Sequence, residues 1–370
     1  MTDARNPELE KAIYEDPDNP EAWQVYADWL ATEGDPRGEI INLELAGKPS
    51  EAAALLEEHK SAWLGEELLS ALEENGDSGL VTLTWERGFV RSARFATEYD
   101  AEADHEAALR ALLESPAARF LRALTLGLWD AEGENFYHGA IDAITQTGPH
   151  EALRELFIGD FEYPDETEIS WTEVGNVGGL WAQLPRLRVM RLQGGGIELG
   201  NLQHETLEEL IVHTGGLPAE AVASISAGRA PALRKLEVWF GDENYGAGGD
   251  IDLLAGLLQG KGYPSLKHLG LMNAEFTDDI AEALPTAGIL PRLETLDLSM
   301  GTMTDRGARA LANNASAFKH LQRISVADNF LGEEGVAALT QAFGSAVVIG
   351  DQRQPYDWGD ELRYFVSVGE

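Results

Sequence analysis

The residues of this chain that could do chemistry are its histidines, its many carboxylates and its glycine-rich turns. The eight histidines are scattered, and they form neither an H-E-x-x-H motif nor a close pair of the kind that binds zinc. They are His59, His105, His138, His150, His204, His213, His268 and His320. The chain has no cysteine, which excludes disulfides, thiolate metal sites and cysteine nucleophiles. We therefore expect no metal site.

Two glycine-rich stretches could be taken for nucleotide-binding loops. The string GLLQGKG at 256–262 lacks the spacing and the hydroxyl of a phosphate loop, and it follows a helix-like run where a strand is required. Gly260 and Gly262 are better explained as the end of a helix, and Gly194-Gly195-Gly196 as a turn. Nothing marks one pair of carboxylates as acid and base. The sequence thus predicts no cofactor and no catalysis.

The charge of the chain narrows the choice of partner. Sixty-four acidic residues against 27 Lys and Arg give a net charge of −37, which repels phosphate backbones and argues against nucleic acid. The acidity has two interpretations: an acidic groove that steers a basic partner, or an adaptation for solubility or a salty cytoplasm. No apolar run approaches the ~18 residues of a membrane span, and the N-terminal sequence has no signal-peptide pattern. We expect a cytoplasmic protein.

A repeat organises most of the chain. Leu321, Ile324, Val326, Asn329 and Leu331 fill every position of the pattern L-x-x-L-x-L-x-x-N-x-L. Seven earlier copies begin at Leu121, Leu153, Leu187, Leu207, Leu233, Leu266 and Leu293, so the intervals are 32, 34, 20, 26, 33, 27 and 28 residues. In most copies Asn is replaced, for example by Gly195, Gly215 and Gly241, where we expect a turn with positive φ.

Each repeat predicts a strand followed by a helix. The L-x-L pair alternates like a strand with both Leu side chains pointing inward. Asp278–Leu284, Asp305–Leu311 and Glu333–Phe343 have helical spacing, with Asp278 and Asp305 at helix starts. The 20-residue unit after Leu187 has no room for a helix. These repeats resemble the ribonuclease-inhibitor type of leucine-rich repeat, which implies an α/β horseshoe solenoid with a parallel concave sheet and convex helices.

The segments outside the repeats are expected to cap the solenoid. Residues 79–97 are typical of a β-hairpin, and 51–75 of an amphipathic helical connector. Strand-like AVVIGDQRQP and ELRYFVSVGE are expected to close the sheet at its other end. We divide the chain into a helical module at 1–47, a connector at 48–78, the hairpin at 79–97, the repeats at 98–346 and a C-terminal cap at 347–370.

The N-terminal module carries a second resemblance. Its strings VYADWL and EGDPRGE, within residues 6–45, resemble the bacterial repeat-companion domain, and GDQR with YFVSVGE resembles an uncharacterised family of bacterial leucine-rich-repeat proteins. Neither resemblance implies a catalytic residue or a cofactor. Trp23, Tyr26, Trp29 and Leu30 share one helix face, which is either an exposed docking face or a small core packed against 9–13 and 40–45. We favour the core, since so short a module has little else to bury.

Strand residues that point out of the concave face are the candidate partner-binding residues. Apolar, aromatic and Met side chains among charges there are typical of protein interfaces. The candidates, which include one residue of the loop after Trp239, are Phe157, Arg191, Ile211, His213, Trp239, Tyr245, Met272 and Asp297. The sequence favours a non-catalytic sensor, adaptor or inhibitor that binds a protein partner, basic if the acidity is functional. The alternative is a target or regulatory subunit of a neighbouring protease or other effector enzyme in a bacterial defence or signalling pair.

Overall fold

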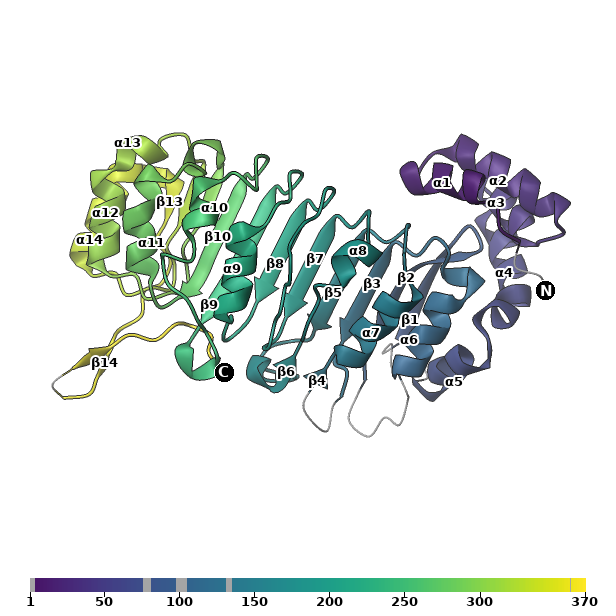
Figure 1. The fold of residues 1–370 in the computed structure, drawn as a ribbon, viewed down its shortest axis with the longest axis horizontal. Helices are drawn as coiled ribbons and strands as arrows, with labels where there is room; N and C mark the ends of the chain where they lie inside the picture. The colour runs from purple at the N-terminus through teal and green to yellow at the C-terminus, as the bar shows by residue number, and fades with distance from the viewer. Residues whose placement is uncertain (1–3, 76–80, 98–104, 131–134, 360) are drawn as a thin grey trace. The chain divides into compact units, whose positions relative to one another are not determined.

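The computed structural model describes residues 4–75, 81–97, 105–130, 135–359 and 361–370 (Figure 1). It divides into two compact units. Unit 1 comprises Met1–Gly133, Gly139–Leu156 and Ala182–Arg186, and unit 2 comprises Glu134–His138, Phe157–Trp181 and Leu187–Glu370. Three elements contain residues of both units, namely β5 (Glu155–Asp160), α7 (His138–Thr147) and α8 (Leu180–Gln183). The domain boundaries expected from the sequence stay predictions.

Unit 1 begins with helices and continues into strands. The helices are α1 (Pro7–Glu15), α2 (Pro20–Thr32), α3 (Arg37–Leu45), α4 (Pro49–Leu64), α5 (Glu66–Asn75) and α6 (His105–Glu114). The helical connector expected over 51–75 consists of α4 and α5, which meet at Gly65 with φ +81°. The expected hairpin is confirmed by antiparallel β1 (Val81–Glu86) and β2 (Phe89–Phe95), and β3 (Ala123–Gly127) pairs in parallel with β2. Residues 76–80, at the junction of the expected connector and hairpin, lie outside the described residues. So do residues 98–104, where the repeats were expected to begin.

The aromatic residues of α2 form the core of unit 1. Trp23, Tyr26 and Leu30 are at most 2% exposed and pack with Phe89 and Phe120, whose ring lies 4.8 Å from that of Trp23. The core interpretation of this helix face is confirmed, with Trp29 partly buried beside it. Phe89 and Phe120 lie outside residues 1–47, so the helices share a core with the hairpin.

The GDPRGE string has a packing explanation in the same unit. The Arg37 guanidinium forms a buried ion pair with Asp35, at 2.6 Å, and lies 4.8 Å from the centroid of the Phe89 ring. A Cβ at Gly38 would lie 2.6 Å from the carbonyl oxygen of Ala27, so glycine is needed where α3 crosses α2. These contacts are structural and account for the motif without a ligand.

Unit 2 is built on parallel strands in chain order. The strands are β7 (Val189–Gln193), β8 (Glu209–His213), β9 (Lys235–Gly241), β10 (His268–Ala274), β11 (Thr295–Asp297), β12 (Arg323–Ser325) and β13 (Val347–Val348). A separate parallel pair joins β4 (Asn135–Phe136) to β6 (Thr172–Glu173). Side chains at the first, fourth and sixth positions of all eight repeat copies are at most 5% exposed, which confirms the repeat pattern.

Helices cover one side of the unit 2 sheet, and we call its other side the open face (Figure 1). They are α9 (Ala219–Ala227), α10 (Ala255–Gln259), α11 (Thr277–Ala283), α12 (Asp305–Asn313), α13 (Ala315–Phe318) and α14 (Glu333–Phe343). The helices expected at 278, 305 and 333 are confirmed, as is the helix-free connection between β7 and β8. Gly260, with φ +72°, ends α10 as expected.

Polar side chains join neighbouring repeats at the helix starts. Asp278 lies in the first turn of α11, yet its carboxylate accepts hydrogen bonds from the backbone of Thr304 and Gly307 at the start of α12. Asp305 likewise accepts from Gly332 and Gly335 at the start of α14. Each acid therefore caps the helix of the following repeat.

The turn glycines behave differently from one another. The expectation of positive φ is right at Gly241, with φ +83°, and wrong at Gly195 and Gly215. Beside Gly195 the positive φ falls on Gly194 and Gly196. A Cβ at Gly215 would overlap the carbonyl oxygen of Gly369, so close approach of another segment requires this glycine.

The C-terminal cap is only partly as expected. Val347–Val348 joins the sheet beside β12, which agrees with the prediction. The final segment does not join it: Leu362–Arg363 (β15) pairs antiparallel with Tyr356–Asp357 (β14) in a separate hairpin. Residues 365–370 then follow the carboxyl ends of the strands instead of adding a strand to the sheet.

Candidate functional site

The candidate site is a set of side chains on the open face of unit 2. Strand register places these side chains in transverse rows, about 4.8 Å apart from one strand to the next. One row pairs Glu209 with Lys235, Lys235 with His268, and His268 with Thr295. The next row pairs Arg191, Ile211, Glu237, Gly270 and Asp297 in the same way. The parallel register thus gathers residues that are far apart in the sequence.

Glu237 lies at the centre of a charged cluster, which we call the Glu237 cluster: His213, Lys235, Glu237 and His268. The Glu237 carboxylate is 2.8 Å from His213 Nε2 and 2.9 Å from Lys235 Nζ. His268 Nε2 lies 3.7 Å away, at ion-pair distance. The hydrogen bond from His213, with the nearby His268 and Lys235, holds the pKa of the Glu237 carboxyl well below its ordinary value. The carboxylate is therefore ionised and fixed in position.

Two neighbouring features shape the surface around this cluster. Gly270 has no side chain and so leaves Glu237 uncovered. A Cβ at this position would lie 3.2 Å from Glu237 Cγ and 3.3 Å from Met272 Sδ. His268 is further oriented by its Nδ1, which lies 2.6 Å from the hydroxyl of Thr295. The cluster is thus preorganised and remains partly exposed.

Trp239 forms the apolar side of the site. Its ring stacks on the His213 imidazole, with centroids 4.0 Å apart and an interplanar angle of 16°. It is partly buried and packs against a small cluster of Phe161, Ile169 and Val368. Its indole N–H is buried without a hydrogen-bond partner in the described part of the chain. An unpaired buried donor costs free energy. The stacking on His213 and the packing against the apolar cluster offset this cost and hold the side chain in place.

The structure brings together some of the predicted partner-binding residues and separates others. His213, Trp239 and Met272 lie at neighbouring positions of β8, β9 and β10, and Ile211 and Asp297 flank them, Ile211 being 8% exposed. The remaining three lie apart from the Glu237 cluster: exposed Arg191 on β7, partly buried Phe157 on β5, and Tyr245, whose hydroxyl lies 3.3 Å from a carboxylate oxygen of Glu370. Whether any of them binds a partner stays a prediction.

Sequence reasoning missed the centre of the site. The candidates selected from the sequence include His213 but not Lys235, Glu237 or His268. The available signal was the register itself, because the repeat aligns Lys235 with His268 and sets Glu237 two positions later. Opposite charges on adjacent strands at such spacing predict an ion-pair cluster.

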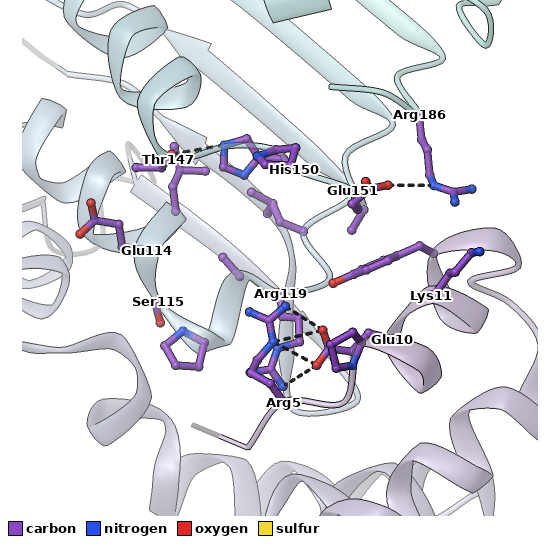
Figure 2. A pocket seen from close by; sticks show the side chains of 18 residues that line it. Arg5, Glu10, Lys11, Glu114, Ser115, Arg119, Thr147, His150, Glu151 and Arg186 are labelled. Atoms are coloured by element: carbon purple, nitrogen blue, oxygen red, sulfur yellow. Dashed lines mark hydrogen bonds and ion pairs between the residues drawn. The ribbon is translucent and has the colours of Figure 1, made fainter. Parts of the chain in front are cut away.

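A separate cavity of about 540 Å³ lies within unit 1. Figure 2 shows Arg5 and Arg119 turned toward Glu10, and Arg186 turned toward Glu151. The distances are 2.7 Å from Arg5 Nη2 and 3.6 Å from Arg119 Nη1 to the Glu10 carboxylate. Arg186 Nε lies 3.2 Å from Glu151. The arginines of this cavity are thus paired with carboxylates of the same unit.

Burial shifts the pKa of two other groups of the cavity, His150 and Tyr14, in favour of their neutral forms. Burial lowers the pKa of His150, whose Nε2 lies 3.0 Å from the carbonyl oxygen of Ile144. Burial also raises the pKa of the Tyr14 phenol. These groups maintain the packing of α1, and their geometry matches no nucleophile–base pair among them.

Two further features concern the described residues. They contain no group of three or more His, Asp or Glu that could hold a metal ion. Within the same residues no helix is long and apolar enough to cross a membrane.

Comparison with known proteins places the chain among repeat proteins. The family model described as "Leucine Rich repeat" matches residues 291–312. Ribonuclease inhibitor from Sus scrofa is 26% identical over 194 residues, covering 48% of this chain and 42% of that protein. Protein NLRC5 from Ictalurus punctatus is 33% identical over 82 residues, covering 21% of this chain and 5% of that protein. The chain therefore spans less than half the length of either relative.

A solved structure is similar over a larger share of the chain. It is a protein from Bacteroides fragilis, 28% identical, and the match covers 74% of this chain and 78% of that one with a TM-score of 0.59. Together with the repeat pattern and the parallel sheet, this likeness supports a repeat solenoid with helices on one side of the sheet.

Proposed function

Since this chain is a leucine-rich-repeat protein, we propose that it is a non-catalytic interaction protein that holds a protein partner on the open face of unit 2. The observation that carries the proposal is the Glu237 cluster beside Trp239 and Met272. A fixed, ionised carboxylate next to an aromatic ring and a thioether is the composition of a protein-binding centre, with an apolar anchor and an orienting polar group. Leucine-rich-repeat proteins are generally protein-interaction modules, which supports this assignment.

The partner that fits this chain is a basic protein. A net charge of −37 attracts a positively charged surface over distances beyond the contact itself and accelerates its association. On the open face, Glu209 and Asp297 offer carboxylates on either side of the Glu237 cluster that Lys and Arg side chains of a partner can reach. The name of the Sus scrofa relative describes an inhibitor of a ribonuclease, and this supports a role as sensor, adaptor or inhibitor, acting by occupying a partner's surface.

Affinity capture with matched variants tests the proposal. The chain is immobilised as wild type, Glu237→Gln, Met272→Ala and Glu220→Gln, and captured proteins from a lysate of its source are quantified. Glu220 lies exposed in the first turn of α9 on the helical side, so its variant makes the same chemical change away from the site. We expect wild type and Glu220→Gln to capture the same protein equally. The two open-face variants should capture at least ~30-fold less, the effect of a hot-spot residue worth about 2 kcal/mol.

Two results would count against the proposal. Equal capture by all four proteins would show that the partner binds elsewhere. If the affinity for the captured protein, measured with purified components, does not fall when salt is raised from 50 to 300 mM, the basic character of the partner is refuted.

A further inference from the structure

The final residues of the chain, 365–370, lie across the carboxyl ends of the unit 2 strands, and we call them the tail. The tail passes successive repeats in reverse order and is anchored at each one. The Phe365 carbonyl accepts from Arg353 at 2.7 Å, and the Ser367 N–H donates to the Met300 carbonyl at 2.9 Å. Farther along, Val368 contacts Asn273 and Glu370 contacts Tyr245. The surface beneath the tail therefore already holds one segment of the chain.

Asn273 clamps the tail through its main chain. Its Nδ2 donates to the Val368 carbonyl at 2.6 Å, and its Oδ1 accepts from the Val368 N–H at 2.9 Å. Asn273 is fully buried, with φ +54°, a region that Asn tolerates better than most residues. A side-chain amide in this arrangement imitates a neighbouring strand, so it recognises an extended backbone of any sequence.

Alternate side chains of the tail supply the specificity. Val366 and Val368 are 7% and 6% exposed, and Val368 packs with Phe161 and Ile169. Trp239 and Met300 lie against the same cluster. Two buried, β-branched residues thus anchor the tail on either side of a bend at Ser367.

The groove continues beyond Gly369. A hollow of about 170 Å³ lies there, lined by the glycines 195, 196, 215 and 216 together with Thr172 and Tyr245. Gly215 must lack a side chain because a Cβ would overlap the Gly369 carbonyl oxygen. Glycines at the ends of consecutive strands therefore keep open a trough wide enough for a peptide backbone.

We propose that this trough is a docking site for an extended segment of a protein partner with the pattern Val-x-Val, and that the tail is its resident competitor. The proposal rests on the segment already seated there, on the Asn273 clamp and on the glycine-lined continuation. It holds whether or not the Glu237 cluster binds a partner. Main-chain hydrogen bonds to Asn273 and to the Met300 carbonyl give affinity, and the two buried Val positions give selectivity.

A labelled peptide tests the trough directly. The probe is fluorescein-labelled RYFVSVGE, the sequence of residues 363–370, with RYFDSDGE as the control peptide. The tail is released in the full chain by Val366→Asp with Val368→Asp, and independently by Ser367→Pro, which removes the N–H that donates to Met300. Fluorescence polarisation should show that both released chains bind the probe at least tenfold more tightly than wild type. Neither should bind the control peptide comparably.

The clamp is tested in the released background. Adding Asn273→Ala should weaken probe binding at least tenfold, whereas Asn313→Ala, an exposed residue at the end of α12, should leave it unchanged. Circular dichroism verifies that each variant is folded. A folded released chain that fails to bind the probe overturns the proposal, as does equal binding by wild type. A doubled mass of wild type in light scattering would assign the trough to the tail of a second copy and would also overturn it.

Discussion

Replacing Asp278 by Ala should loosen the start of a helix that belongs to the next repeat. The Asp278 carboxylate accepts hydrogen bonds from the Thr304 N–H at 2.8 Å, the Thr304 hydroxyl at 2.7 Å and the Gly307 N–H at 2.9 Å. The substitution leaves these donors at the start of α12 without their acceptor. Since Asp278 itself lies on α11, the damage should appear about 26 residues away from the substitution.

The size of the effect follows from the number of bonds and their burial. A hydrogen bond to a charged group contributes about 1.5–3 kcal/mol, and loss of an N-cap costs about 0.5–2 kcal/mol. The Asp278 side chain is only 11% exposed, so water replaces the carboxylate poorly. Because the bonds share one acceptor and are not additive, we expect a loss of about 3 kcal/mol.

Asp279 provides a matched control on the adjacent position. Its contact is an exposed ion pair with Arg306 at 2.7 Å, and such pairs contribute about 0.5 kcal/mol or less. Asp279→Ala removes the same charge from the same helix, so any general relief of repulsion in this acidic chain is equal in both variants.

Hydrogen exchange is the appropriate assay, because repeat arrays need not unfold in one step. For Asp278→Ala we expect amide protection in α12 to fall about 100-fold, which corresponds to about 3 kcal/mol. Asp279→Ala should change it less than about threefold. If the two variants lose equal protection, or if the loss is confined to α11, the assignment of Asp278 as the cap of the following helix is refuted.

Three further predictions concern other parts of the chain. Since the Glu237 carboxyl has a lowered pKa in the fold, it stabilises the protein above its unfolded pKa near 4.5 and loses this contribution as the pH falls further. The stability difference between wild type and Glu237→Gln in urea should therefore shrink below pH 4.5; a constant difference contradicts the cluster. Gly241→Ala should lower the melting temperature well beyond Gly246→Ala, which costs only the left-handed φ, about 1 kcal/mol, because nothing lies near its Cβ. Equal melting temperatures would contradict the close approach at Gly241. Trp23→Ala should cost about 3–5 kcal/mol, seen as lost amide protection in α1–α3; unchanged protection there would exclude Trp23 from the core.

Sequence reasoning succeeded where a residue's role depends on its own neighbours in the chain. The L-x-x-L-x-L copies identified buried positions in all eight repeats, because alternation within a few residues decides which side a strand buries. The same applies to Glu333–Phe343, whose apolar spacing predicted α14.

The parts that escaped prediction depend on contacts between distant residues. The sequence position of Asp278 predicts a cap for α11. Its carboxylate instead accepts a hydrogen bond from Gly307 of α12, because adjacent repeats bring the two helix starts together. The alternation of Val366 and Val368 predicted a strand that closes the sheet. The last strand of the sheet is instead β13, and the tail does not pair with it. It follows the ends of the strands instead, because Asn273 offers paired donor and acceptor groups there.

The open face shows why composition alone could not locate the site. Glu237 is one of 64 acidic residues and is distinguished by its neighbours, since the parallel register sets His213 and His268 on either side of it. Those neighbours are 24 and 31 residues away, so a motif search within one repeat cannot find them. In a repeat protein with an acidic surface, the carboxylate that marks a candidate site is the one paired with basic side chains of the same protein. Such a carboxylate is immobile and ionised, and it orients the adjacent aromatic surface at Trp239 for contact.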